Sequence, residues 1–145
     1  MKCAEPIVEE QKIEQSESVI QMPNGLLGFE QVKNYVLLGS QEEAPFLWLQ
    51  MAEDPSLAFL VVSPTEVLDS YQPDINQEEV DFLGLENPED ALLLNIVTLH
   101  RDGTATVNLK GPIVINRHTL VGKQVVPLNA GQFSLQHPLS AVAAG

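Results

Sequence analysis

Short aliphatic runs, each bounded by turn-forming residues, recur along this chain and constrain its fold more than any other feature. The longest clean apolar run, LAFLVV, is far shorter than the roughly 20 residues that a membrane-spanning helix needs. Short β-rich runs separated by Gly, Pro, Asn and Asp are typical of antiparallel sheets. The runs are residues 18–22, 35–39, 45–51, 57–63, 91–100, 104–111, 112–116 and 120–126. They predict an all-β, mainly antiparallel fold, a small single-domain β-barrel or sandwich.

The clearest local prediction is a hairpin that joins residues 91–100 to residues 104–111. The pair Asp102-Gly103 stands between these runs, and such a pair favours a tight turn because glycine tolerates positive φ. A second hairpin is expected to join 112–116 to 120–126. Within it, Gly122 marks a bulge or a close approach.

Two short helical insertions are predicted between the strands. The first begins at Ser63, with Pro64 following it and Glu66 three residues later, which fits a capping box. The second begins at Asn76, an N-cap residue, and ends near Gly84. The second helix is too short to be stable alone, so it must be held by docking.

Length and composition predict one domain over residues 16–140. A chain of 145 residues that is 44% hydrophobic fills one core. Residues 1–15 form a variable segment, either frayed or a first strand, and residues 141–145 a flexible tail. The start has no apolar signal region, which favours a cytoplasmic protein. The single cysteine, Cys3, has no partner for a disulfide.

Charge is distributed unevenly along the sequence. All 20 carboxylates lie at or before Asp102, whereas the stretch after it holds only the cations Lys110, Arg117 and Lys123, and the net charge is -13. An acidic body repels nucleic-acid phosphates and attracts basic surfaces. Direct nucleic-acid binding is therefore not expected. The remaining alternatives are a basic protein partner and a charge that serves solubility alone.

No pattern supports catalysis, a cofactor or a metal site. Gly122-Lys123 lacks the upstream glycine and the following Ser or Thr of a phosphate-binding loop. The three histidines, His100, His118 and His137, lack the paired spacing of metal ligands. We therefore predict a non-enzymatic protein without a cofactor or metal.

Six elements in fixed order resemble the family of the flagellar assembly factor FliW. They are PNGLLGFEQVKNYVLL, PFLWLQ, DPSLAFLVVSP, NPEDALLLNIVTL, TVNLKGPIVINRHTLVGKQVV and a closing HPL, and they extend over about residues 19–139. Two positions depart from the family pattern: Leu27 stands where proline is common, and Met51 where a small residue is usual.

The resemblance implies a compact β-barrel-like fold and a non-catalytic function. Members of this family bind the translational repressor CsrA and antagonise its repression of flagellin mRNA. They also bind flagellin, which couples the level of flagellin to its translation. We accordingly expect CsrA and flagellin as partners of a cytoplasmic protein that is monomeric when free and contacts neither nucleic acid nor membrane directly.

The candidate partner-binding residues lie in the acidic, partly helical middle of the chain. This stretch combines carboxylates with one aromatic residue of the kind that concentrates binding energy at interfaces. The candidates are Asp69, Tyr71, Asp74, Glu78, Glu79 and Asp81. The alternative is an ordinary solvated helix.

A second candidate contact comes from Phe46 and Trp48, which alternate on one predicted strand. One interpretation is an exposed hydrophobic patch for flagellin. The other, which a single tryptophan in a small β domain favours, is burial in the core. A different function also stays open: a small β-barrel that binds an apolar small molecule or another protein without catalysis.

Overall fold

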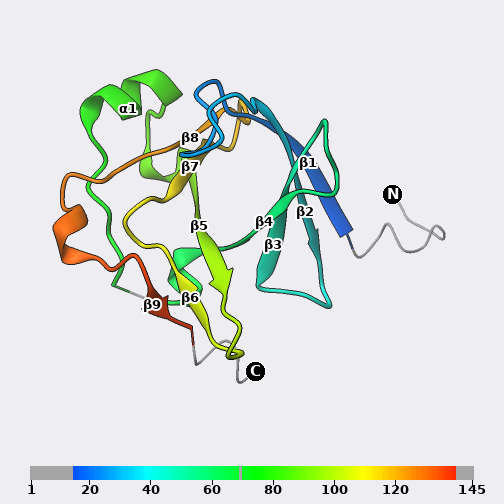
Figure 1. Cartoon of the computed structure of the whole chain (residues 1–145). Coiled ribbons are helices and arrows are strands. Elements are labelled where there is room, and N and C mark those ends of the chain that lie inside the picture. Colours follow the sequence, from blue (N-terminus) through cyan, green and yellow to red (C-terminus); the bar gives the residue numbers. More distant parts are fainter. Residues whose placement is uncertain (1–14, 69, 140–145) are drawn as a thin grey trace.

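The computed structural model describes residues 15–68 and 70–139, and in this range antiparallel strands form the body of the molecule (Figure 1). The strands are β1 (Gln15–Gln21), β2 (Asn34–Ser40), β3 (Phe46–Met51), β4 (Ala58–Val62), β5 (Ala91–Leu99), β6 (Ala105–Val107), β7 (Ile113–Asn116), β8 (Gly122–Gln124) and β9 (His137–Pro138). Every predicted run overlaps one of them, so the all-β prediction is confirmed. Residues 1–14 and 141–145, which carry most of the two predicted terminal segments, lie outside the described residues.

Strand β5 belongs to two sheets, and this arrangement gives the fold its barrel-like shape. Its second half pairs with β4 and β6, whereas its first half, from Ala91 to Leu94, pairs with β7. Strand β8 follows β7, and one isolated bridge joins Val121 to Gln21 at the end of β1. The strands thus curl round towards β1, but no continuous ladder closes them. The sheet is therefore open, and "barrel" describes its curvature only.

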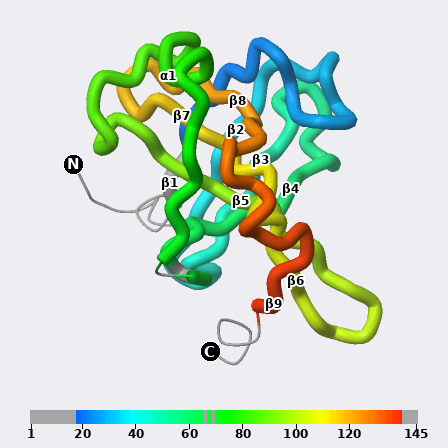
Figure 2. The backbone as a smooth tube through the Cα atoms, turned by 90° about the vertical axis from the view of Figure 1, so that its left-hand side faces the viewer, coloured from blue at the N-terminus to red at the C-terminus, as the bar shows by residue number. Residues whose placement is uncertain are grey.

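Both predicted hairpins are present. In the turn between β5 and β6, the His100 N–H donates to the Thr104 carbonyl at 2.8 Å, and Gly103 has φ +91°. This turn projects from the body of the molecule (Figure 2). In the hairpin of β7 and β8, Gly122 lies opposite Ile115. A Cβ atom on Gly122 would come within 2.9 Å of side-chain atoms of Ile115 and Met22, so the predicted close approach is confirmed.

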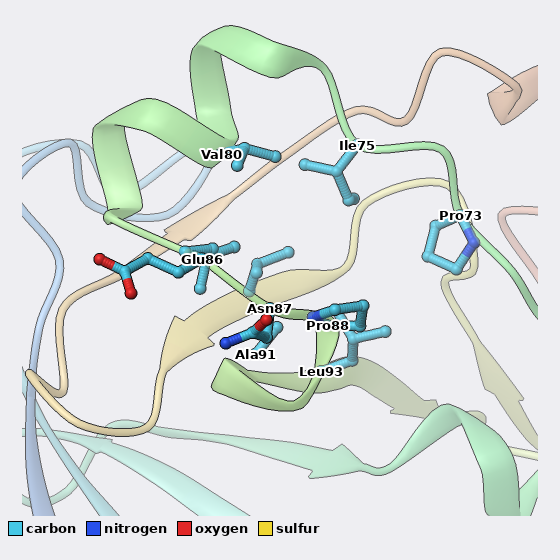
Figure 3. A pocket seen from close by; sticks show the side chains of 10 residues that line it. Pro73, Ile75, Val80, Glu86, Asn87, Pro88, Ala91 and Leu93 are labelled. Atoms are coloured by element: carbon cyan, nitrogen blue, oxygen red, sulfur yellow. The ribbon is translucent and has the colours of Figure 1, made fainter.

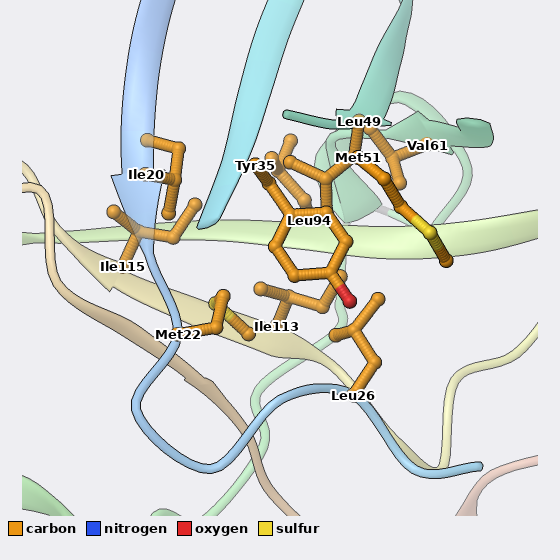
Figure 4. Packing of buried hydrophobic residues seen from close by; sticks show 10 residues of the cluster. All are labelled: Ile20, Met22, Leu26, Tyr35, Leu49, Met51, Val61, Leu94, Ile113 and Ile115. Atoms are coloured by element: carbon orange, nitrogen blue, oxygen red, sulfur yellow. The ribbon is translucent and has the colours of Figure 1, made fainter. Parts of the chain in front are cut away.

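The core consists of three adjoining clusters on opposite faces of shared strands. The first fills the interior of the curled sheet (Figure 4): Ile20, Met22, Leu26, Tyr35, Leu49, Met51, Val61, Leu94, Ile113 and Ile115. The second, on the outer face of β4, includes Val62, Val97 and Leu109. The third, Leu83, Val114 and Val125, lies where the helix Gln77–Leu83 packs on the sheet. Alternation along β4 and β7 explains the arrangement, because neighbouring residues point to opposite faces.

The helical predictions are confirmed in part. The first insertion is a single 3-10 turn, η2 (Pro64–Glu66), and the Ser63 side chain makes no capping hydrogen bond to it. The second is α1 (Gln77–Leu83), with Asn76 as N-cap and Gly84 as C-cap, as predicted. Two further 3-10 turns are η3 (Pro88–Asp90) and η4 (Ala130–Gln132). Within residues 15–68 and 70–139, no helix is long and apolar enough to cross a membrane.

Candidate partner-binding surface

The most strongly charged stretch of the described chain is residues 72–91, which we call the acidic segment. It holds seven carboxylates and no Lys, Arg or His. The segment contains α1 and η3 and runs across β7 and β8 (Figure 2). Its position therefore brings carboxylates that are spread over twenty residues of sequence onto one side of the fold.

Helix α1 is fixed by its caps and by packing. The Asn76 Oδ1 accepts a hydrogen bond from the Glu78 N–H at 2.7 Å, and Gly84 ends the helix at φ +69°. Leu83 is buried against Val114, and its carbonyl accepts a hydrogen bond of 2.8 Å from the Nδ2 of Asn116 on β7. A helix of seven residues is marginal alone, so these contacts keep it in place.

The predicted carboxylates differ in their surroundings. Asp74, Glu78 and Asp81 are exposed. Glu79 is half-buried and pairs with Lys123 of β8 at 2.6 Å. Both side chains of this pair are largely shielded from solvent, which makes it a stronger link than a surface ion pair. Glu79 thus ties α1 to β8, and the other three acids face solvent.

Tyr71 is not the surface anchor that the sequence predicts. Its side chain is 6% exposed, its hydroxyl donates to the Leu109 carbonyl at 2.7 Å, and its ring packs on Phe133. Burial raises the pKa of this hydroxyl. The expectation that Tyr71 is exposed is wrong, because its side chain fills the second core cluster, and its part in partner binding stays a prediction. Asp69 lies outside the described residues.

The other end of the acidic segment is held by η3 and the β7–β8 turn. Asp90 accepts hydrogen bonds from the backbone N–H groups of Asn87 at 2.9 Å and Glu86 at 3.1 Å, and its second oxygen is 2.9 Å from the His118 Nε2. These donors lower the pKa of Asp90, with the Asn87 N–H as the largest cause. Arg117 donates to the Glu89 carbonyl at 2.7 Å.

The hairpin of β7 and β8 therefore supports the acidic segment through its basic residues. Lys123 and His118 pair with carboxylates of the segment, and Arg117 bonds its backbone. Sequence reasoning missed this role because it depends on which carboxylates lie nearby in space. The only signal was the separation of cations and carboxylates along the chain.

An apolar cavity of about 350 Å³ lies between α1 and the sheet below it (Figure 3). Ile75 and Val80 border it from the side of α1, and Pro88, Ala91 and Leu93 from the opposite side. Pro73, Leu85, Glu86, Asn87 and Val114 complete the lining. The Glu86 carboxylate extends away from the apolar side chains. The cavity could not be predicted, because its walls come from separate elements.

The two residues of the second predicted contact, Phe46 and Trp48, have different surroundings in the structure. Both are half-buried. Phe46 packs against the second core cluster. Trp48 lies between Leu38 of β2 and Leu60 of β4, on the face of β3 opposite to the buried Leu49. It borders a shallow hollow of about 160 Å³. The single tryptophan is therefore on the outer sheet face and not in the interior of the curled sheet.

Within the described ranges, no group of three or more His, Cys, Asp or Glu side chains is arranged to hold a metal ion.

Comparison with known proteins identifies the family. A sequence model described as FliW protein matches residues 3–139. This chain belongs to the FliW family. The flagellar assembly factor FliW of Natranaerobius thermophilus is 35% identical over 141 residues, which cover 96% of this chain and 92% of the relative. That of Geobacter sulfurreducens is 39% identical over 144 residues, covering 99% and 86%.

The fold agrees with that of a solved FliW structure. A crystal structure of the flagellar assembly factor FliW superimposes with a TM-score of 0.74 at 31% identity, over 83% of this chain and 84% of that one. Leu27 stands where proline is common in the family pattern. In this chain, the Leu27 N–H donates a hydrogen bond to the Gln124 Oε1 at 2.9 Å. Proline has no N–H and would not make this bond. Met51, the other departure, is buried in the first core cluster.

Proposed function

We propose that this protein is a flagellar assembly factor that binds the translational repressor CsrA, antagonises its repression of flagellin mRNA, and also binds flagellin. Membership of the FliW family carries the proposal, since the relatives are flagellar assembly factors and match this chain over most of its length. In this role, flagellin that occupies the protein leaves less of it to restrain CsrA, so the flagellin level sets its own translation.

The acidic segment is the proposed surface for CsrA. An RNA-binding protein presents cations to phosphate, and these same cations are attracted by the exposed carboxylates of Asp74, Glu78 and Asp81. Such complementarity chiefly accelerates encounter and selects the partner. Glu79 contributes by fixing α1 to Lys123, and Tyr71 by supporting the loop before the helix from within the core.

The outer face around Trp48 is the proposed surface for flagellin. Leu38, Trp48 and Leu60 lie side by side across β2, β3 and β4. Val19 on β1 is 56% exposed, and Val36 lies opposite it on β2. A continuous apolar sheet face with an aromatic residue at its centre suits a hydrophobic segment of a partner. Phe46 lies on the same face of β3 and packs against the second core cluster.

The protein is proposed to act in the cytoplasm as a monomer that contacts neither nucleic acid nor membrane. Its net charge of -13 opposes both phosphate binding and self-association.

The test is titration of the purified chain with CsrA and with flagellin, separately and in competition, at low and moderate salt. We expect both proteins to bind, and saturating flagellin to change the affinity for CsrA. CsrA binding should weaken with salt, because exposed charges are screened. Failure of both partners to bind at micromolar concentrations would show that the proposed function is wrong.

A further inference from the structure

We propose that the cavity beneath α1 receives one apolar side chain from a basic segment of the protein partner. The inference rests on the proposed function and deepens it, because it names the contact that anchors the partner on the acidic segment. The carboxylates alone attract many cationic proteins, so a specific complex needs a further contact that a charged surface does not supply.

The size and lining of the cavity suit an apolar side chain. Its volume of about 350 Å³ is at the lower end of the range for pockets that enclose ligands. Ile75, Val80 and Leu93 contribute aliphatic walls, and α1 and β5 hold them in place. Binding energy at protein interfaces concentrates where an anchor residue fills a desolvated pocket that is surrounded by polar contacts.

The rim of the cavity decides which kind of occupant fits. Glu86 lines the cavity, with its carboxylate directed away from the apolar side chains, and the acidic segment, which supplies eight of the ten lining residues, carries six further carboxylates. These carboxylates repel a fatty acid or a second copy of this acidic chain, and they offer nothing specific to a neutral apolar molecule. They attract a segment in which Lys or Arg residues flank an aliphatic or aromatic side chain.

The basic residues of the β7–β8 hairpin, which contact the acidic segment, are already engaged within the chain. Lys123 pairs with Glu79 at 2.6 Å, Arg117 donates to backbone carbonyls of Glu89 and Ala91, and His118 bonds Asp90. Among the described residues, Glu86 forms no ion pair. Its carboxylate is thus placed to meet a cation of the partner beside the apolar anchor.

The experiment fills the cavity from within. In Ala91→Phe, the added ring occupies the space that the partner side chain would take. The matched control is Ala52→Phe, which adds the same ring at an exposed turn position after β3. CsrA, the basic partner proposed above, is titrated against the wild type and both variants. We expect at least about a tenfold loss of affinity for Ala91→Phe, the scale of an interface hot spot, and little change for the control.

A second variant tests the cavity even if Ala91→Phe misfolds. Val80→Ala removes part of the wall without adding bulk, and alanine favours the helix, so we expect α1 to persist while CsrA binds several-fold more weakly. In the wild type, CsrA should also shift the methyl resonances of Ile75, Val80 and Leu93, whereas those of the exposed Leu99 at the far end of β5 stay in place.

The outcomes separate this inference from the proposed function. If the wild type binds neither CsrA nor flagellin, both fail. If the wild type binds CsrA and the two cavity variants bind it equally well, the anchor is refuted and the proposed function stands. If hexanol, a neutral apolar probe, saturates the cavity without changing CsrA affinity, the cavity is a small-molecule site and the anchor is again refuted.

Discussion

At the scale of single residues, Gly122 shows how closely two parts of the chain approach. A Cβ atom there would lie 2.9 Å from the Ile115 Cγ1, 2.9 Å from the Met22 Sδ and 3.2 Å from the Val114 carbonyl oxygen. One of these atoms belongs to the backbone and cannot move alone. The glycine is therefore required by packing between β7, β8 and the segment after β1.

Gly122→Ala is expected to lower the free energy of unfolding by about 1–3 kcal/mol, the usual cost of overpacking a core. Urea unfolding followed by circular dichroism measures it. Gly131→Ala is the control, because a Cβ at Gly131 meets no atom within 4 Å. Equal effects of the two substitutions would mean that the loss of backbone freedom, and not the close approach, is what matters at position 122.

Asp90 contributes stability that depends on pH. Its donors lower its pKa below the ordinary 3.8, with the Asn87 N–H first, the His118 side chain second and the Glu86 N–H third. A carboxyl group with a lowered pKa in the folded state stabilises the fold above its unfolded pKa, and this contribution is lost as pH falls through the folded value.

We therefore expect Asp90→Asn to be less stable than the wild type at pH 7, and the difference to shrink as pH falls below about 3.8 and through the lowered pKa. Urea unfolding over a pH series measures this difference. In His118→Ala, carbon-detected NMR should find the pKa of Asp90 closer to its ordinary value but still below it, because the two backbone donors remain. A difference that grows towards acid would contradict the sign of the effect.

At the scale of elements, α1 depends on the capping hydrogen bond at its N-terminus. Asn76→Ala removes the acceptor for the Glu78 N–H and should cost about 1 kcal/mol, as is typical of N-cap losses. Asn76→Asp keeps an oxygen at the same position and should retain most of the stability. Urea unfolding gives the total, and hydrogen exchange of the α1 amides locates it. Unchanged exchange in Asn76→Ala would show that docking alone holds the helix.

The elements that local chemistry determines were predictable. Asp102-Gly103 predicted the β5–β6 hairpin, and Asn76 with Gly84 predicted both ends of α1. The division of β5 between two sheets was not predictable, because pairing with β7 depends on contacts between residues that are distant in sequence. The pattern around Ser63 predicted a helix, but Pro64 begins only one 3-10 turn, since the chain must then reach Tyr71 in the core.

The candidate site was predictable in its charge and not in its shape. The acids of residues 72–91 are visible in the sequence, and Asp74, Glu78 and Asp81 are exposed as a contact surface requires. Tyr71 was misread because an aromatic residue among acids looks the same in sequence whether it faces solvent or the core. The cavity under α1 requires Leu93 and Val114 to lie below Val80, which only the tertiary fold specifies.

At the scale of the whole molecule, the fold places the cations late in the sequence against the acidic segment, so that they hold this charged surface in place. The β7–β8 hairpin supplies Arg117, His118 and Lys123, which bond the backbone and side chains of the acidic segment. Of the seven carboxylates there, Glu79 forms an ion pair with Lys123 and Asp90 a hydrogen bond with His118, and the other five form no ion pair within the described part of the chain. The remaining five leave a strong negative potential on one side of the molecule, which is suited to steering a basic partner.

Two double variants distinguish the effect of net charge on CsrA association from the effect of where the charges lie. Glu78→Lys with Asp81→Lys reverses two exposed carboxylates on α1 without breaking the pair of Glu79 with Lys123. Glu42→Lys with Glu43→Lys reverses two exposed carboxylates between β2 and β3, so the net charge changes by the same amount. If position matters, the α1 variant should associate with CsrA about tenfold more slowly at low salt, and the control only slightly.

Stopped-flow association at several salt concentrations measures both rates. The wild-type rate should fall steeply with salt and the α1 variant's rate only weakly, because the variant lacks the steering field that salt screens. Equal slowing in the two variants would mean that overall charge alone attracts CsrA. Slowing confined to the control would move the CsrA surface to the Trp48 side of the fold, since Glu43 borders the hollow beside Trp48.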